Sequence, residues 1–269
     1  MSDSAGLTAD NRHRVEALHR SFAEPFTAEQ AAETWGVSLD RARRLVRYLA
    51  DRGWLDRVRR GLYLPVPLDS HRSGQAHMDP WVVASVAFEP AYVAGWSAAE
   101  HWDLTEQIFR DVLVVTGRRL RDRSPTIGGT TFALHTVDVD KHFGLAPVWH
   151  GNHRIDVTDP SRTVLDMLAN PKWGGGIRHT SAAIGEYFET SHRNDDRLVE
   201  YGDRLGNQSV FKRLGYLIEL MELDAPDLVS ECLHRRSAGV NALDPSVKSG
   251  GPTASRWGLR LNVDLLPQS

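Results

Sequence analysis

The feature that most constrains this chain is a run of helix and turn signals in its first quarter. The stretch Thr27–Gln30 has the form of a capping box, so a short helix is expected to begin there. Gly36 ends that helix and permits a tight turn, and Ser38 is a second candidate N-cap. Apolar residues then recur at helical spacing up to Leu49, and Gly53 stands where helices commonly end. Two helices joined by a very short turn are therefore predicted.

A two-stranded hairpin is predicted directly after this helix pair. Residues 54–58 have the pattern of a strand, residues 59–61 that of its turn, and residues 62–64 that of the returning strand. An earlier amphipathic helix is predicted over about residues 11–22. Three helices followed by a hairpin are the element order of a winged helix-turn-helix domain, which we expect over residues 1–67.

Positive charge is concentrated in the same region. The chain has a formal net charge of −3, yet residues 41–60 hold eight arginines and only two acidic residues, Asp51 and Asp56. Residues 64–269 hold 21 basic and 26 acidic side chains, a net charge of −5. A local basic patch on an otherwise acidic chain indicates a nucleic-acid-binding element. The alternative is a solvated helix face held in surface ion pairs.

The predicted second helix of the pair and the hairpin supply the candidate DNA contacts. An α-helix fits the major groove, where an arginine can donate two hydrogen bonds to guanine, so Arg43, Arg44 and Arg47 are candidate base contacts. Hydroxyl groups at helix N-termini are suited to binding phosphate oxygens. Arginines on a wing can bind phosphate oxygens or enter a narrow minor groove. The candidate DNA-binding residues are Thr27, Ser38, Arg41, Arg43, Arg44, Arg47, Arg57, Arg59 and Arg60.

The remainder of the chain is expected to form a larger mixed α/β domain over residues 79–269, after a linker at 66–79. The fold class is therefore α+β. A buried strand is predicted at 112–116, and the half of this domain after Asp159 has helical patterns with a break at 171–176. The other expected elements are strands at 91–94, 126–135, 155–157 and 257–264, and helices at 97–102, 177–190, 195–205 and 209–223.

Compartment signals are consistent with one another. Cys232 is the single cysteine, so an intramolecular disulfide is impossible, which fits a reducing compartment. The N-terminal residues lack the apolar core of a signal peptide. The apolar stretch near residues 81–88 is far shorter than the ~20 residues of a membrane span. We expect a cytoplasmic protein with no membrane partner.

Catalytic and metal signals are weak. His150, His153 and Asp156 are spaced by threes, but the intervening Gly151-Asn152 favours a turn over a converging metal site. No glycine-rich phosphate loop with its lysine is present. We expect no enzyme, no metal and no cofactor; an enzyme guided to DNA, with this cluster as its metal site, is the alternative.

Several stretches along the chain resemble one known family. In this order they are Gly61–Tyr63, Tyr92–Trp102, Val112–Thr116, Asp159–Asp166, Phe211–Glu219 and Leu243–Pro245. Together these stretches resemble the AbiEi family of antitoxins of type IV toxin–antitoxin systems. Members of this family are cytoplasmic bacterial transcriptional repressors paired with a nucleotidyltransferase-like toxin.

The resemblance implies a concrete function. It implies repression of a toxin–antitoxin operon through inverted repeats in the promoter, bound as double-stranded DNA by the winged domain. It also implies that the second domain counteracts the toxin without requiring a stable complex. We place the candidate antitoxin surface at Arg162, Lys212 and Arg213. For Arg162 the alternative is an internal salt bridge. Its position in the first turn of a helix is unfavourable for a cation and suggests a specific partner such as a buried carboxylate.

Two further expectations concern the second domain. Its acidic balance indicates that it is not itself a second DNA clamp. The alternative overall function is a ligand-responsive regulator whose second domain senses a small molecule. The hinge-like Gly174–Gly176 and the many aromatic residues allow an apolar pocket for such a ligand.

Overall fold

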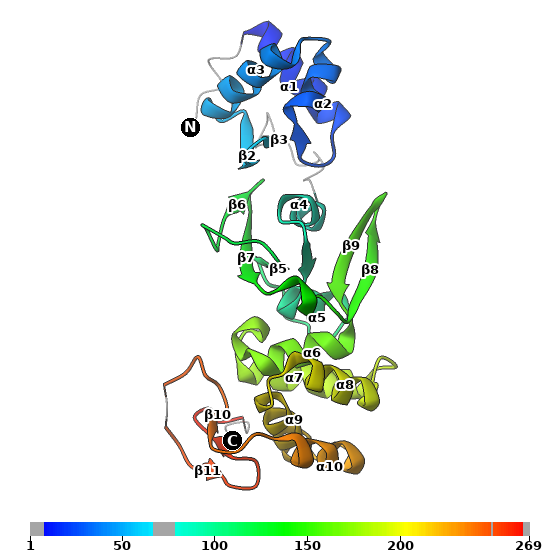
Figure 1. The fold of residues 1–269 in the computed structure, drawn as a ribbon, viewed down its shortest axis with the longest axis vertical. Helices are drawn as coiled ribbons and strands as arrows, with labels where there is room; N and C mark the ends of the chain where they lie inside the picture. Colours follow the sequence, from blue (N-terminus) through cyan, green and yellow to red (C-terminus); the bar gives the residue numbers. More distant parts are fainter. Residues whose placement is uncertain (1–7, 67–78, 249, 266–269) are drawn as a thin grey trace.

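The computed structural model describes residues 8–66, 79–248 and 250–265, and the chain forms an elongated molecule with the N-terminal helices at one end (Figure 1). The first segment contains three helices and a small antiparallel sheet of strand order β1-β3-β2. Its elements are α1 (Ala9–Ser21), β1 (Phe26–Thr27), α2 (Ala28–Trp35), α3 (Leu39–Asp51), β2 (Leu55–Arg59) and β3 (Leu62–Pro65). We call this segment the winged unit.

Local chemistry explains why the chain turns between α2 and α3. The Gln30 amide donates to Thr27 Oγ1 at 3.3 Å, and the Thr27 amide donates to Gln30 Oε1 at 2.7 Å, so the predicted capping box is present. Gly36 has φ +63°, a left-handed conformation that costs glycine little. Behind this turn, apolar side chains from all three helices and from β1 and β2 form a core of Val15, Leu18, Phe26, Ala31, Val46, Leu49 and Leu55.

A six-stranded mixed sheet forms the middle of the molecule, with strand order β6-β7-β5-β4-β9-β8. The β4–β9 and β5–β7 pairs are parallel, and the remaining pairs are antiparallel. The strands are β4 (Ala91–Val93), β5 (Val112–Thr116), β6 (Thr126–Ile127), β7 (Thr130–Thr136), β8 (Leu145–His150) and β9 (His153–Thr158). Two helices, α4 (Pro80–Ala87) and α5 (Gly95–His101), pack against these strands.

Helices and a small tail sheet form the far end (Figure 1). The helix α6 (Pro160–Ala169) lies in the middle of this core, since nearly all of its side chains are buried. Around it lie α7 (Ile177–Glu189), α8 (Asp195–Leu205), α9 (Ser209–Leu220) and α10 (Pro226–Arg235), with short 3₁₀ turns η1 (Val139–Lys141) and η2 (Pro171–Gly174). The tail sheet has strand order β10-β12-β11, from Asn241–Ala242, Leu259–Arg260 and Thr253–Ala254.

The α+β class predicted from the sequence is confirmed, but the short strands β1, β10 and β11 were not predicted, and three other segments differ as well. The strand β8 was not predicted because Pro147 and alternating exposure give an edge strand a weak signal. The helix α10 was not predicted because only Leu228 and Cys232 are buried on it. The strand expected over 257–264 shortens to Leu259–Arg260. Residues 67–78 of the predicted linker lie outside the described residues, as do residues 1–7 and 266–269 of the predicted domains.

The winged unit packs directly on the central sheet. Leu64 of β3 is 2% exposed and shares a core with α4, β6 and β7, and Val58 of β2 packs against the same core. The Gly128 amide donates to Asp56 Oδ2 at 3.1 Å. His153 of the β8–β9 hairpin lies 3.3 Å from the Glu24 carboxylate. The hairpin β2–β3 is therefore supported from behind by the second part of the chain.

Candidate nucleic-acid interface

The outer face of α3 is lined with arginine. Ala42, Val46 and Leu49 are buried in the core of the winged unit, which turns the opposite side of the helix to solvent. That side carries the exposed residues Asp40, Arg41, Arg43, Arg44, Arg47 and Tyr48. The structure therefore places all four predicted arginines of this helix on its accessible face.

These arginines differ in the partners they already have. Arg43 lies 3.2 Å from Glu29 Oε1 and 3.9 Å from Asp40 Oδ1, and both contacts are exposed ion pairs. Within the described ranges, Arg41, Arg44 and Arg47 form no ion pair with a carboxylate. Guanidinium groups without an internal acceptor are available to guanine edges or phosphates. Arg44 and Arg47 thus differ from Arg43 in having no carboxylate partner among the described residues.

The two predicted N-terminal hydroxyl groups also differ. The Thr27 hydroxyl is engaged in the capping box of α2. Ser38 occupies the N-cap position of α3 with extended backbone angles, but its side chain makes no capping hydrogen bond, and the residue is exposed. A free hydroxyl beside the unsatisfied amides of a helix N-terminus is suited to a phosphate oxygen.

The wing adds three more exposed arginines beside α3. Arg57 and Arg59 lie on β2, where a register irregularity separates them, and Arg60 lies in the turn to β3. The helix α3 packs directly against β2. A helix sized for the major groove and a basic hairpin beside it can contact base edges and flanking phosphates at once.

The second part presents another basic segment that sequence reasoning did not single out. The connection from β5 to β6 exposes Arg118, Arg119, Arg121 and Arg123, with Asp122 as its one acidic residue. The signal was present as a charge run, but averaging over the acidic second part concealed it.

Arg162 does not lie on a surface. The residue is 2% exposed, and its Nε donates to Asp166 Oδ1 at 2.8 Å within α6. Its Nη1 donates to the Phe143 carbonyl at 2.7 Å, and the guanidinium lies 4.0 Å from the centre of the Phe143 ring. Desolvation raises the pKa of Asp166, and Arg162 opposes that shift. The predicted antitoxin surface is wrong at Arg162, and the alternative, an internal salt bridge, is present.

Lys212 and Arg213 are buried as well, so the predicted surface is wrong at these two positions too. They lie on α9, which packs between α10, α6 and the tail, so neither side chain reaches solvent. The Lys212 amine donates to the Gly239 carbonyl at 2.8 Å and to Asn241 Oδ1 at 2.7 Å, and burial lowers its pKa. Arg213 donates to the carbonyls of Leu243, Leu168 and Ala242, and burial lowers its pKa to about 10. Hydrogen bonds from both residues therefore hold the C-terminal tail against the helical core.

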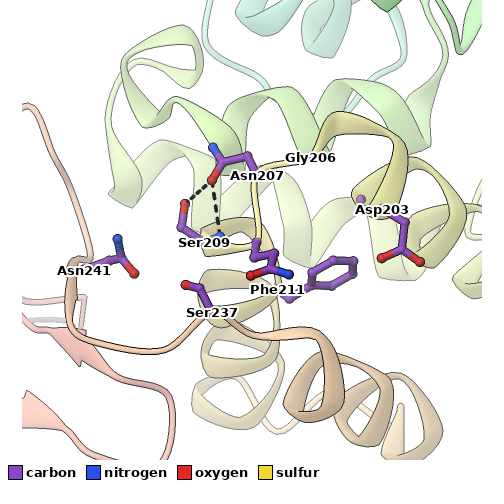
Figure 2. Close-up of a pocket in the computed structure, with 9 residues that line it drawn as sticks. Asp203, Gly206, Asn207, Ser209, Phe211, Ser237 and Asn241 are labelled. Atoms are coloured by element: carbon purple, nitrogen blue, oxygen red, sulfur yellow. Dashed lines mark hydrogen bonds between the residues drawn. The ribbon is translucent and has the colours of Figure 1, made fainter.

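A polar pocket of about 320 Å³ lies beside the contact between α9 and the tail (Figure 2). The Ser209 hydroxyl donates to Asn207 Oδ1 at 2.8 Å and accepts from Arg213 Nη1 at 3.0 Å. Asn241 lines the pocket and also accepts from Lys212. Because these polar groups satisfy one another, the pocket continues the structural network of α9 and the tail.

The histidine cluster considered as a metal site is divided among separate partners. His150 Nδ1 lies 2.5 Å from Asp79 Oδ2, His153 pairs with Glu24, and Asp156 pairs with Arg154. The residues between them form the hairpin turn that Gly151-Asn152 predicted. Among the residues that the structure describes, no group of three or more His, Cys, Asp or Glu side chains could hold a metal ion.

Three helices, a tight turn and an arginine-lined hairpin define a winged helix-turn-helix domain at the N-terminus. Residues 13–66 match the family model described as a transcriptional regulator, AbiEi antitoxin. The predicted resemblance to the AbiEi family is therefore confirmed over the winged unit, which matches its transcriptional-regulator domain.

The fold of the chain also has a counterpart among solved structures. It is similar to the crystal structure of the RV2827C protein from Mycobacterium tuberculosis, with a TM-score of 0.64 and 17% identity. The similarity covers 94% of this chain and 92% of that one, so the two share an overall fold. No curated protein sequence matches the chain. Over the described residues, the helices are too short or too polar to cross a membrane.

Proposed function

We propose that this protein is a transcriptional repressor and antitoxin that binds inverted repeats in the promoter of its own toxin–antitoxin operon. The observation that carries the proposal is the pair Arg44 and Arg47, exposed and without an internal carboxylate on α3 of an AbiEi-type regulator domain. Such side chains suit guanine edges in a major groove.

The proposed binding mode assigns a task to each element of the winged unit. The helix α3 enters the major groove, where Arg44 and Arg47 read bases and Arg41 and Arg43 lie beside them. Ser38 and the first amides of α3 bind one phosphate. The wing arginines Arg57, Arg59 and Arg60, with Thr27 at the start of α2, position the domain on the adjacent backbone. A repressor with this task acts on promoter DNA in the cytoplasm.

The antitoxin activity is assigned to the second part of the chain, against a nucleotidyltransferase-like toxin and without a required stable complex. The burial of Arg162, Lys212 and Arg213 removes them from any contact surface. Their proposed contribution is therefore indirect, since they hold α6, α9 and the tail in place.

The direct test is a salt titration of the purified protein on its own upstream DNA and on a scrambled duplex of equal length. We expect tight, selective binding that weakens steeply with salt. Each of Arg44→Ala and Arg47→Ala should cost about 1–3 kcal/mol on the native duplex and far less on the scrambled one. Arg178→Ala, an exposed arginine on α7, is the control and should leave both affinities unchanged. Full affinity in both α3 variants would remove α3 as the reading helix.

A second candidate function, a ligand-responsive regulator, is favoured by a cavity of about 630 Å³ at the junction of the two parts. The cavity is lined by the end of α1, the start of α4 and the β8–β9 turn, including His19, Phe22, Trp149 and His153. A small molecule here would contact the winged unit and the sheet together. Loss of operator binding on addition of a metabolite would support this function. Rescue of cells from a co-expressed toxin encoded beside this protein would support the antitoxin instead.

A further inference from the structure

The connection between β5 and β6 is a strongly basic loop. Arg118, Arg119, Arg121 and Arg123 are all exposed, and over the described ranges none forms an ion pair with a carboxylate. The single acidic residue, Asp122, accepts a hydrogen bond from the Ser124 amide at 2.9 Å. Exposed charge runs usually carry opposite charges that pair, so four guanidinium groups without a carboxylate partner are an unusual surface.

The backbone of this loop is held at both ends. The Arg118 amide donates to Thr116 Oγ1 at 3.1 Å, and the Arg118 carbonyl accepts from Thr136 Oγ1 at 3.0 Å. The Arg123 carbonyl accepts from the Leu134 amide at 2.8 Å. The loop therefore projects its arginines from a fixed backbone, which lowers the ordering cost of binding.

The second end of the loop lies beside the wing, whereas its first end, at Arg118, lies next to Thr136, at the opposite end of β7 from Thr130 and β6. The loop leads into β6, which ends at Ile127, and the next residue, Gly128, donates to Asp56 of β2. Ile127 and Leu64 of β3 share one core. In Figure 1, α3, β2 and β6 follow one another along the same side of the molecule, and α3 contacts β2 as β2 contacts β6.

We propose that the β5–β6 loop is a second DNA contact, which binds backbone phosphates of the duplex next to the segment covered by the wing. The proposal rests on the proposed function, since it takes the winged unit to bind duplex DNA. Arginine pairs well with phosphate, and an irregular loop without a helix or ribbon to enter a groove suits backbone contacts. The net negative charge of the second part does not prevent this contact. Salt at physiological concentration screens charges farther than about 8–10 Å, so a phosphate at the loop interacts mainly with the nearby arginines.

The chemistry predicts affinity without sequence selectivity. Phosphate contacts raise binding to any duplex and steepen its salt dependence by about 0.9 in the log–log slope for each phosphate neutralised. The loop would thus strengthen operator and non-operator binding by the same factor, while α3 supplies the difference between them.

The test compares two variants of the full chain that lose the same charge. The loop variant replaces Arg118, Arg119, Arg121 and Arg123 with alanine. The control variant replaces the exposed cations Arg110, Lys172, Arg178 and Lys248 with alanine, and all four belong neither to the winged unit nor to the β5–β6 loop. A third variant with lysine at the four loop positions retains the charge. Binding to the operator and to a scrambled duplex is measured across a series of NaCl concentrations, with hydroxyl-radical footprints on the operator.

We expect the loop variant to lose about 2–4 units of salt slope on both duplexes, while the control and lysine variants keep the wild-type slope. The footprint of the loop variant should lose protection only on the side of the wing away from α3. Equal slopes in the loop variant and the wild type would overturn the loop contact and leave the proposed function standing. Equal losses in the loop and control variants would also overturn it, because long-range charge would then be the cause. A wild-type protein that binds the two duplexes equally well would refute the proposed function. The salt slopes of the variants would still show whether the loop contacts DNA.

Discussion

At the scale of single residues, an arginine of one part of the chain is exposed and an arginine of the other part is buried. Arg44 is exposed on α3 and forms no ion pair within the described residues, whereas Arg162 is 2% exposed and hydrogen-bonded on several sides. Asp166 Oδ2 is buried and has no hydrogen-bond partner among the described residues. A buried carboxylate with one unsatisfied oxygen depends on its single cation, so the Arg162–Asp166 pair is sensitive to the loss of either member.

We expect Arg162→Met to lower the free energy of unfolding by about 3–5 kcal/mol at neutral pH, because it leaves the Asp166 charge buried without compensation. The pKa of Asp166 is already raised by burial and would rise further in this variant. A carboxyl whose folded-state pKa is raised favours the folded state at low pH and loses that contribution as pH rises. The deficit measured by urea unfolding should therefore shrink toward acidic pH.

The double variant Arg162→Met/Asp166→Leu serves as the control for this prediction. It removes both charges together, so most of the stability should return. A double variant as unstable as the single one would show that the hydrogen bonds from Arg162 to backbone carbonyls, rather than the ion pair, hold this region together.

At the scale of elements, α9 and the tail form a close contact that depends on the absence of a side chain. A Cβ atom at Gly215 would lie 2.0 Å from Cη2 of Trp257, whose ring therefore rests directly on the backbone of α9. Trp257 is 1% exposed, and its indole nitrogen donates to Glu219 Oε2 at 2.6 Å. The Lys212 and Arg213 hydrogen bonds to the tail lie on the same helix.

Gly215→Ala should consequently lower the free energy of unfolding by about 1–3 kcal/mol, since the buried indole must shift. Gly185→Ala on α7 is a matched control, because the nearest atom to its added Cβ is Met221 Sδ at 4.0 Å. Replacing a glycine inside a helix without a clash should stabilise the chain by about 0.5–1 kcal/mol. Thermal and urea unfolding measure both, and a stabilising Gly215→Ala would mean that the tail is not packed on α9 in solution.

The extent to which sequence predicts this structure follows from the range of each interaction. The capping box at Thr27 and the turn at Gly36 depend on near neighbours, so the helices and the hairpin of the winged unit could be predicted, whereas β1, which pairs with the distant β3, was not. The environment of Lys212 depends on Gly239 and Asn241, whose approach is set by the tail. The arginines of α3 are exposed, as a DNA-contacting role requires, whereas Lys212 is buried, because charge in a sequence does not reveal which helix is enclosed.

At the scale of the whole molecule, the two parts share a core instead of being joined only through a linker. Leu64 comes from the wing, but it is buried with Val82 and Ile127 of the second part. The Asp56–Gly128 hydrogen bond lies beside this contact. Elements that share buried apolar surface tend to unfold together, because exposing one exposes the other.

We therefore expect the wild-type chain to unfold in one transition, and operator DNA to raise the stability of all of it. A ligand that binds only the folded state stabilises whatever unfolds cooperatively with its site. Leu64→Ala should lower stability by about 2–5 kcal/mol and also loosen the coupling of the two parts. Hydrogen exchange resolves the two effects: in the wild type, operator DNA should protect the amides of α6 and α9 as well as those of α3. In Leu64→Ala that protection should be confined to the winged unit. If DNA protects α3 alone in the wild type, then the shared core does not couple the two parts, and the second part cannot influence operator binding through the wing.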